Sequence, residues 1–141
     1  MDAESKIVVH LGQCHCGRVK FEFDGPQAMV AIDCNCSICA MKRNTHVFVN
    51  QQHFRLLSGA DDLTTYTFNT GVAQHMFCKH CGICAFYRPR SNPDAYAVTI
   101  YCVRPGTLTH VTVRTFDGQH WEDAFARANL GALSRPHGDA P

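Results

Sequence analysis

Nine cysteines, most of them gathered in three short clusters, constrain this chain of 141 residues more than any other feature of its sequence. Because their number is odd, disulfide bonds within one chain cannot pair them all. The first residues are acidic and polar and lack the basic start and apolar core of a secretory signal, so we expect a reducing, cytoplasmic location. In that compartment, clustered cysteines favour metal binding over disulfide bonds.

The composition indicates one globular domain, with 45% hydrophobic and 18% charged residues. The formal net charge is only +1 and no basic tract occurs, so we expect no nucleic-acid partner. No apolar stretch is long enough to cross a bilayer, so we expect no membrane partner either. We expect a flexible N-terminus over residues 1–6, a single domain over 7–130 and a flexible tail over 131–141. The sequence makes no prediction about the oligomeric state.

Short runs of alternating apolar and polar residues, separated by turn-forming residues, predict an all-β fold. The expected strands cover 7–11, 19–23, 28–32, 46–49, 54–57, 64–68, 96–103 and 110–114. One segment departs from this pattern, because Trp121, Ala124, Phe125 and Ala128 follow helical spacing. We therefore expect one short C-terminal helix that ends before Gly131.

Two of the cysteine clusters have the spacing of a closed structural zinc site. In an extended backbone, Cys14 and Cys16 project to the same face and can bind one ion. Cys78 and Cys81 form a C-x2-C turn in which two sulfurs converge. Together these pairs supply four thiolates, which complete a tetrahedral zinc site with no open position.

The remaining cluster offers three thiolates within six residues, from Cys34, Cys36 and Cys39. Three protein ligands and a free fourth position are typical of a catalytic zinc, so the sequence predicts two zinc ions per chain. The alternative is a second structural site that a distant residue closes. The candidates for that fourth ligand are Cys84, Cys102 and His46.

Four segments that include these clusters resemble the family of glutathione-dependent formaldehyde-activating enzymes and centromere protein V. The segments cover 12–17, 33–39, 64–70 and 77–82, within a likeness that extends from about residue 11 to 125. The resemblance implies a tent-like fold of several small antiparallel sheets. It also implies that the four-cysteine site is structural and that the three-cysteine zinc serves glutathione chemistry. The implied reaction joins glutathione and formaldehyde to form S-(hydroxymethyl)glutathione, which is carbon–sulfur lyase chemistry in reverse.

The functional prediction is a zinc-dependent enzyme that acts on a small-molecule thiol, glutathione, through Cys34, Cys36 and Cys39. Glutathione carries two carboxylates, which need cationic partners. The candidate substrate-binding residues are Lys42, Arg43, His46, Arg88 and Arg90. The alternative is a non-catalytic zinc module that carries glutathione or serves as a protein-interaction scaffold. A zinc deaminase is excluded, because the sequence has no P-C-x-x-C element to pair with an H-x-E element, as that class requires.

Overall fold

Ten β-strands account for most of the regular structure in residues 6–137, the part of the chain that the computed structural model describes. The strands are β1 (Ile7–Gln13), β2 (Lys20–Pro26), β3 (Ala28–Cys34), β4 (His46–Asn50), β5 (Phe54–Ser58), β6 (Leu63–Tyr66), β7 (His75–Cys78), β8 (Phe86–Tyr87), β9 (Ala95–Thr99) and β10 (His110–Phe116). Two α-helices accompany them, α1 (Ser37–Lys42) and α2 (Trp121–Ala128).

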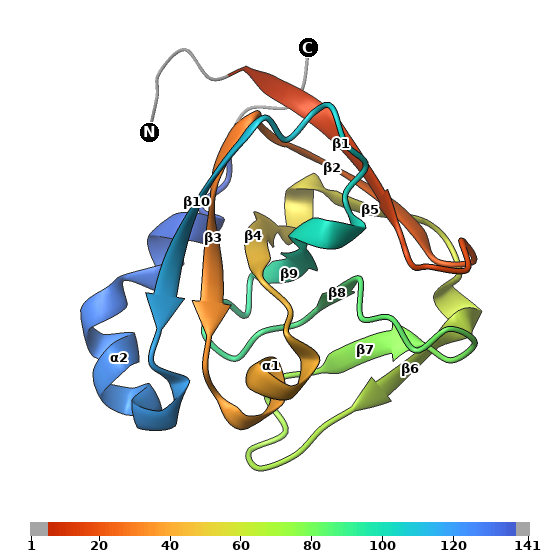
Figure 1. Cartoon of the computed structure of the whole chain (residues 1–141). Coiled ribbons are helices and arrows are strands. Elements are labelled where there is room, and N and C mark those ends of the chain that lie inside the picture. The colour runs from red at the N-terminus through yellow and green to blue at the C-terminus, as the bar shows by residue number, and fades with distance from the viewer. Residues whose placement is uncertain (1–5, 138–141) are drawn as a thin grey trace.

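The strands form three small sheets, which confirms the predicted all-β class (Figure 1). One sheet has the order β1-β2-β5, the largest has the order β10-β3-β4-β9-β8, and β6 pairs with β7 alone. Neighbouring strands are antiparallel except β10 and β3, which run parallel. In Figure 1, β10 and β3 lie on the left, the β1-β2-β5 sheet slopes down the right, and β6 and β7 lie below.

Alternation along the strands fixes which side chains enter the core. In β2, Phe21 and Phe23 have no exposed surface, whereas Lys20 is exposed. The Phe21 ring lies 5.6 Å from that of Phe54 and 5.5 Å from that of Phe86, measured between centroids. These contacts join β2, β5 and β8, so the first core lies between the sheets and holds them together.

A second core packs under the C-terminal helix. It contains Ile32 of β3, Phe48 of β4, Tyr87 of β8 and Phe116 of β10, with Trp121 of α2 packed against them. The predicted helix is thus confirmed, with its apolar face toward the largest sheet. This second core also surrounds the cysteines of the three-cysteine cluster, and it therefore positions the candidate site.

Several local features differ from the sequence expectation: β7 and β8 were not expected, and the strand expected over 96–103 ends at Thr99. Helix α2 ends before Gly131 as expected, with Asn129 as its C-cap in a left-handed conformation with φ 49°. A 3-10 turn, η5 (Leu130–Ser134), follows it and buries Ser134, whose hydroxyl donates to Asp94 at 2.9 Å, so packing continues past residue 130. Helix α1 is an additional element within the three-cysteine segment. The rest of the two expected flexible ends, at 1–5 and 138–141, lies outside the described residues.

Candidate metal sites and the adjoining cavity

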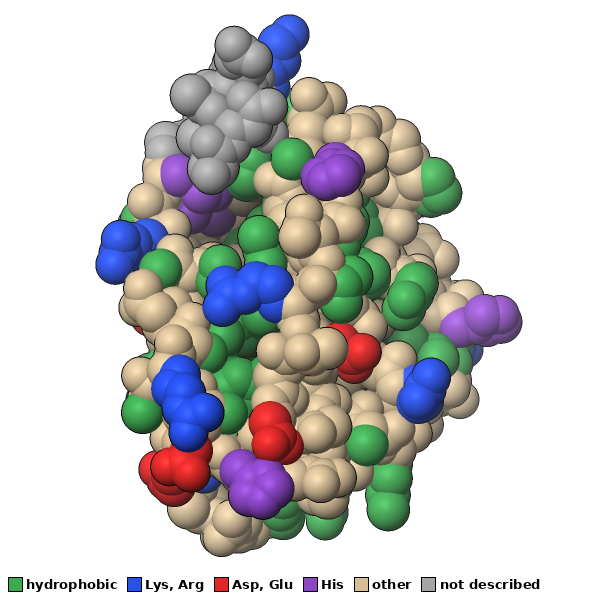
Figure 2. Space-filling view, turned by 60° about the vertical axis from the view of Figure 1, so that its left-hand side comes forward, with side chains coloured by type: hydrophobic (Ala, Val, Ile, Leu, Met, Phe, Trp, Pro, Cys, Tyr) green, Lys and Arg blue, Asp and Glu red, His purple; other side chains and the backbone are tan. Residues whose placement is uncertain are grey.

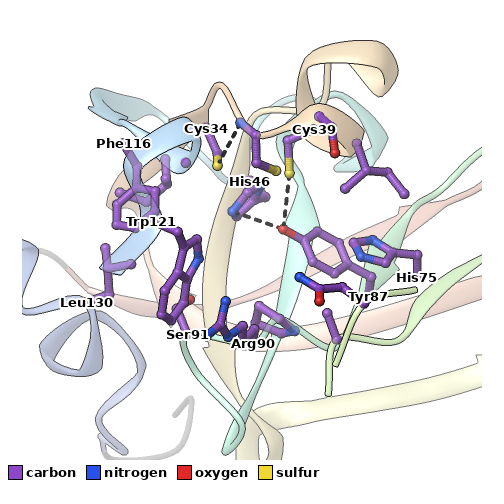
Figure 3. A pocket seen from close by; sticks show the side chains of 18 of the residues that line it. Cys34, Cys39, His46, His75, Tyr87, Arg90, Ser91, Phe116, Trp121 and Leu130 are labelled. Atoms are coloured by element: carbon purple, nitrogen blue, oxygen red, sulfur yellow. Dashed lines mark hydrogen bonds between the residues drawn. The ribbon is translucent and has the colours of Figure 1, made fainter. Parts of the chain in front are cut away.

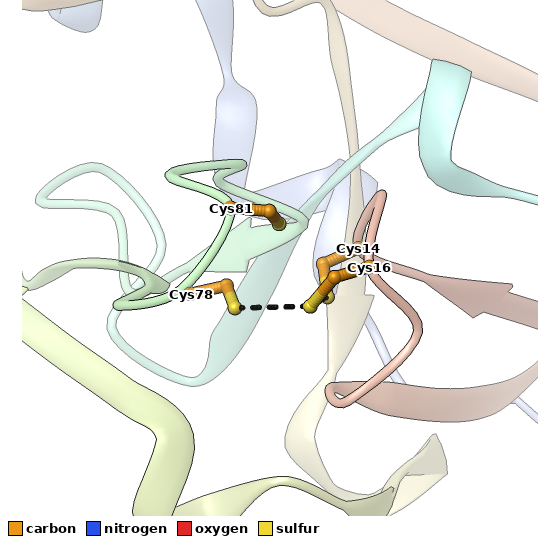
Figure 4. A group of neighbouring side chains, drawn as sticks. All are labelled: Cys14, Cys16, Cys78 and Cys81. Atoms are coloured by element: carbon orange, nitrogen blue, oxygen red, sulfur yellow. Dashed lines mark hydrogen bonds between the residues drawn. The ribbon is translucent and has the colours of Figure 1, made fainter.

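The four-cysteine cluster joins two sheets at one point. Cys14 and Cys16 come from the turn after β1, and Cys78 and Cys81 come from the end of β7 and the turn beyond it (Figure 4). Their sulfur atoms all lie within 4.8 Å of one another. The Cys16 sulfur lies 3.6 Å from both Cys14 Sγ and Cys78 Sγ, close to the separation of about 3.8 Å that tetrahedral Zn–S bonds of about 2.3 Å require. This donor set fits zinc.

Local backbone geometry preorganises the same cluster. Gly82 has φ +78° and its amide donates to the carbonyl of Cys78 at 2.8 Å, which closes the C-x2-C turn. The amide of Val19 donates to Cys14 Sγ and that of His80 to Cys78 Sγ, each at 3.4 Å. Amide donors of this kind stabilise thiolates and orient them toward a metal.

The three-cysteine cluster lies where β3 ends and α1 begins. Cys34 is the last residue of β3, Cys36 is the N-cap of α1, and Cys39 is buried within α1. Their sulfur atoms also lie within 4.8 Å of one another. Among residues 6–137 no fourth cysteine, histidine or carboxylate completes this group. The two clusters could therefore hold metal ions, one with four sulfur ligands and one with three.

None of the three candidates for a distant fourth ligand belongs to that group. The Cys84 sulfur accepts from Lys42 Nζ at 3.3 Å, and Cys102 lines a different cavity. His46 is buried, and its Nε2 lies 3.4 Å from the hydroxyl of Tyr87. This hydroxyl lies 3.7 Å from Cys39 Sγ, so Tyr87 contacts both the histidine and the cluster (Figure 3).

Burial keeps the groups behind the cluster uncharged near neutral pH. Desolvation lowers the pKa of His46 to about 4 and raises the pKa of Tyr87 well above its ordinary value. Desolvation and the nearby Lys42 ammonium also lower the pKa of His75 to about 4. Its ring stacks on Tyr87 with centroids 4.9 Å apart. Neutral groups here provide hydrogen bonds without adding to the charge of the site.

The three thiols influence one another strongly. Hydrogen bonds from Cys34 and Cys39 lower the pKa of Cys36 far below its ordinary value. The same contacts with Cys36 raise the pKa of Cys34, and contacts with Cys34 and Cys36 raise the pKa of Cys39. Without a metal, the cluster thus favours a single shared thiolate. A divalent cation removes this penalty, because it attracts all three thiolates.

A cavity of about 230 Å³ adjoins the three-cysteine cluster. The three cysteines form part of its wall, and most of the remaining lining is apolar or aromatic, from β3, β4, β8, β10, α2 and the loop after β6. Figure 3 shows Cys34 and Cys39 at one end and Arg90 and Ser91 at the other. The open cluster thus faces a largely apolar pocket.

The structure brings only some of the predicted substrate-binding residues to this cavity. His46 and Arg90 line it, and the Arg90 guanidinium lies 3.7 Å from the centre of the Trp121 ring and donates to Glu122 at 2.9 Å. Lys42 and Arg43 line a second cavity of about 900 Å³ instead. Arg88 stacks on Tyr96 at 4.0 Å and lines neither. On the face in Figure 2, basic side chains are scattered among acidic and histidine side chains.

Sequence reasoning missed three residues of the site. Tyr87 lies in a strand of two residues, too short to show alternation. Trp121 follows the helical pattern of a core residue, although it also lines the cavity. At Gly118 a Cβ would lie 2.6 Å from Cys36 Cβ and 2.7 Å from Cys34 Sγ. In the sequence, the Asp117-Gly118 pair indicates only a turn, and nothing relates this glycine to the cysteine cluster about 80 residues earlier.

The structure is that of a β protein with one closed sulfur cluster and one open cluster at a cavity, and each cluster could hold a metal ion. The family model of the glutathione-dependent formaldehyde-activating enzyme matches residues 9–121. The chain belongs to this family, which is related to formaldehyde-activating glutathione chemistry. It is also similar to the crystal structure of a Rhodobacter sphaeroides protein, with 35% identity and a TM-score of 0.63 over 74% of this chain and 99% of that one. No helix among residues 6–137 is both long and apolar enough to span a membrane.

Proposed function

We propose that this protein is a zinc enzyme that adds the thiol of glutathione to formaldehyde or a related aldehyde. The product class is an S-(hydroxymethyl)glutathione, so the reverse reaction is that of a carbon–sulfur lyase. The observation that carries the proposal is the position of Cys34, Cys36 and Cys39, which converge in the wall of a cavity without a fourth protein ligand among residues 6–137. Family membership supports the choice of glutathione.

The reaction is simple in its atoms. The sulfur attacks the carbonyl carbon, the π bond of the carbonyl breaks, and the proton of the thiol ends on the carbonyl oxygen. The thiolate is the reactive form, and a thiol of ordinary pKa near 8.5 is mostly protonated at neutral pH. Zinc bound to the three cysteines would supply a coordination position at which a thiol loses its proton.

The chain's own residues hold and shield the reacting atoms. The Tyr87 hydroxyl contacts Cys39 Sγ and is itself held by His46 Nε2, so it fixes the orientation of that sulfur. The aromatic walls border the space where sulfur and carbonyl meet and make it less polar than bulk water. Of the predicted basic residues, Arg90 lines the cavity, but its guanidinium pairs with Glu122, so we do not assign it to a carboxylate of glutathione. We also propose a cytoplasmic location, since the chemistry requires reduced thiols.

The test is turnover. Zinc-loaded protein should form S-(hydroxymethyl)glutathione faster than the spontaneous reaction, as measured by NMR during the approach to equilibrium. Zinc removal or Cys36→Ser should abolish the acceleration, whereas Cys102→Ser, outside both clusters, should retain it. If glutathione binds without acceleration of the reaction, the protein is not an enzyme for this reaction, and a glutathione carrier becomes the better hypothesis. If glutathione does not bind at all, a protein-interaction scaffold becomes the better hypothesis.

A further inference from the structure

The cavity beside the three cysteines is larger than formaldehyde needs. Its volume is about 230 Å³, whereas a water molecule takes up about 30 Å³ in the liquid. Formaldehyde contributes only two heavy atoms to the adduct, so the part of the adduct that comes from the aldehyde fills little of the cavity. Apolar walls left in contact with water are unfavourable. The shape of the site therefore favours a larger substituent on the reacting carbon.

The walls have the chemistry of an aryl-binding site. Five aromatic side chains line the cavity together with Leu130, namely Phe48, Phe68, Tyr87, Phe116 and Trp121. The Phe116 and Trp121 rings meet edge to face, with centroids 6.3 Å apart and an interplanar angle of 71°. The Trp121 ring also stacks on Phe125, with centroids 4.7 Å apart, and the Arg90 guanidinium lies over it at 3.7 Å, so Trp121 presents an edge rather than a face to a bound ring. Arg90 already pairs with Glu122, so the aromatic walls dominate what the cavity can select.

The cavity cannot enclose such a group together with the whole of glutathione. Pockets that enclose drug-sized ligands usually measure about 300–1,000 Å³, more than the volume of about 230 Å³ found here. Cys34 and Cys39 lie at one end, so the groups on either side of the new carbon–sulfur bond compete for the cavity. Glutathione carries charged groups, which apolar walls disfavour, so the uncharged substituent of the aldehyde is the better occupant.

We propose that the aldehyde partner carries an aryl substituent, which binds against Trp121 and Phe68. This inference rests on the proposed function and names its substrate class. The thiol R–SH and the aldehyde Ar–CHO give R–S–CH(OH)–Ar. One carbon–sulfur bond forms, the carbonyl π bond breaks, and the thiol proton moves to the oxygen. Trp121 and Phe68 are then specificity-determining residues.

Two stable thioethers mimic the competing adducts. S-benzylglutathione places a phenyl ring one carbon from sulfur, as an aryl aldehyde does, and S-methylglutathione represents formaldehyde. In cobalt-substituted protein, glutathione bound as a thiolate should strengthen the sulfur-to-cobalt absorption, and either thioether should reverse that change by displacing it. S-benzylglutathione should do so at a concentration at least about 10-fold lower, the effect expected from burying a phenyl ring.

A matched pair of variants locates the selectivity. Phe68 lines the cavity and is 40% exposed, so Phe68→Ala should fold normally and reduce the preference for the benzyl thioether at least about threefold. Tyr101 is 76% exposed and lies outside this cavity, so Tyr101→Ala should keep the preference for the benzyl thioether.

The outcomes separate the two proposals. If glutathione leaves the cobalt absorption unchanged, the proposed function fails and this inference fails with it. If glutathione binds but the two thioethers compete equally, the proposed function stands and the aryl substrate is refuted. A benzyl preference that survives in Phe68→Ala refutes the binding position.

Discussion

Replacing Gly118 by alanine should weaken metal binding at the three-cysteine cluster and leave the four-cysteine cluster intact. A Cβ at this position would lie 2.6 Å from Cys36 Cβ, about 0.8 Å closer than ordinary contact begins at 3.4 Å, and 2.7 Å from Cys34 Sγ. Neither neighbour is the end of a long flexible side chain, so the strand end and the helix start must move apart. Overpacking of this kind costs about 1–3 kcal/mol.

That shift should appear as lost zinc affinity, because ligand distances tolerate only about 0.2 Å. A cost of 1.4 kcal/mol corresponds to a factor of about 10 at 25 °C, so we expect a 10- to 100-fold weaker second site. The assay is zinc release to a competing chromogenic chelator, which resolves two sites of different affinity. Gly131→Ala is the control, since nothing lies within 4 Å of its Cβ position. If Gly118→Ala releases both ions as the wild type does, the proposed packing against the cluster is wrong.

Further predictions concern the metals and stability. Elemental analysis of unchelated protein should find about two zinc ions per chain, and a value of one would argue against the open site. Cys81→Ser should unfold the domain, because a structural zinc contributes about 10–16 kcal/mol, comparable with the whole stability of a domain. Cys36→Ser should leave the domain folded, as measured by circular dichroism. The reverse result would mean that the three-cysteine site is structural and the four-cysteine site is not. Hydrogen bonds from Arg55 lower the pKa of the buried Asp24. The stability that this carboxylate provides is therefore complete above its unfolded pKa of about 3.9 and is lost as the pH falls through the lower folded value. Arg55→Met should lower the free energy of unfolding by about 1–3 kcal/mol at pH 7. In thermal melts, the variant should also lose less stability than the wild type as the pH falls. An unchanged dependence of the melting temperature on pH would show that the ion pair is unimportant.

The elements that the sequence determined are those with short-range causes. Alternation at 19–23 identifies β2 because every second side chain faces the same side, and Phe21 and Phe23 are indeed fully buried. The C-x-C and C-x2-C spacings identify the ligand pairs, since each pair converges through its own turn. The helical spacing from Trp121 to Ala128 identifies α2 for the same reason. Each of these signals lies within a few residues.

The cavity and its walls were decided by the tertiary structure alone. Tyr87 reaches Cys39 across 48 residues, and Gly118 packs on Cys34 and Cys36 across more than 80. Such contacts depend on how the sheets pack, and no local pattern encodes them. Lys42, three residues from Cys39 in the sequence, contacts Cys84 and His75 and does not line the cavity. Proximity along the chain identified the metal ligands, whereas packing between distant strands determined which side chains surround them.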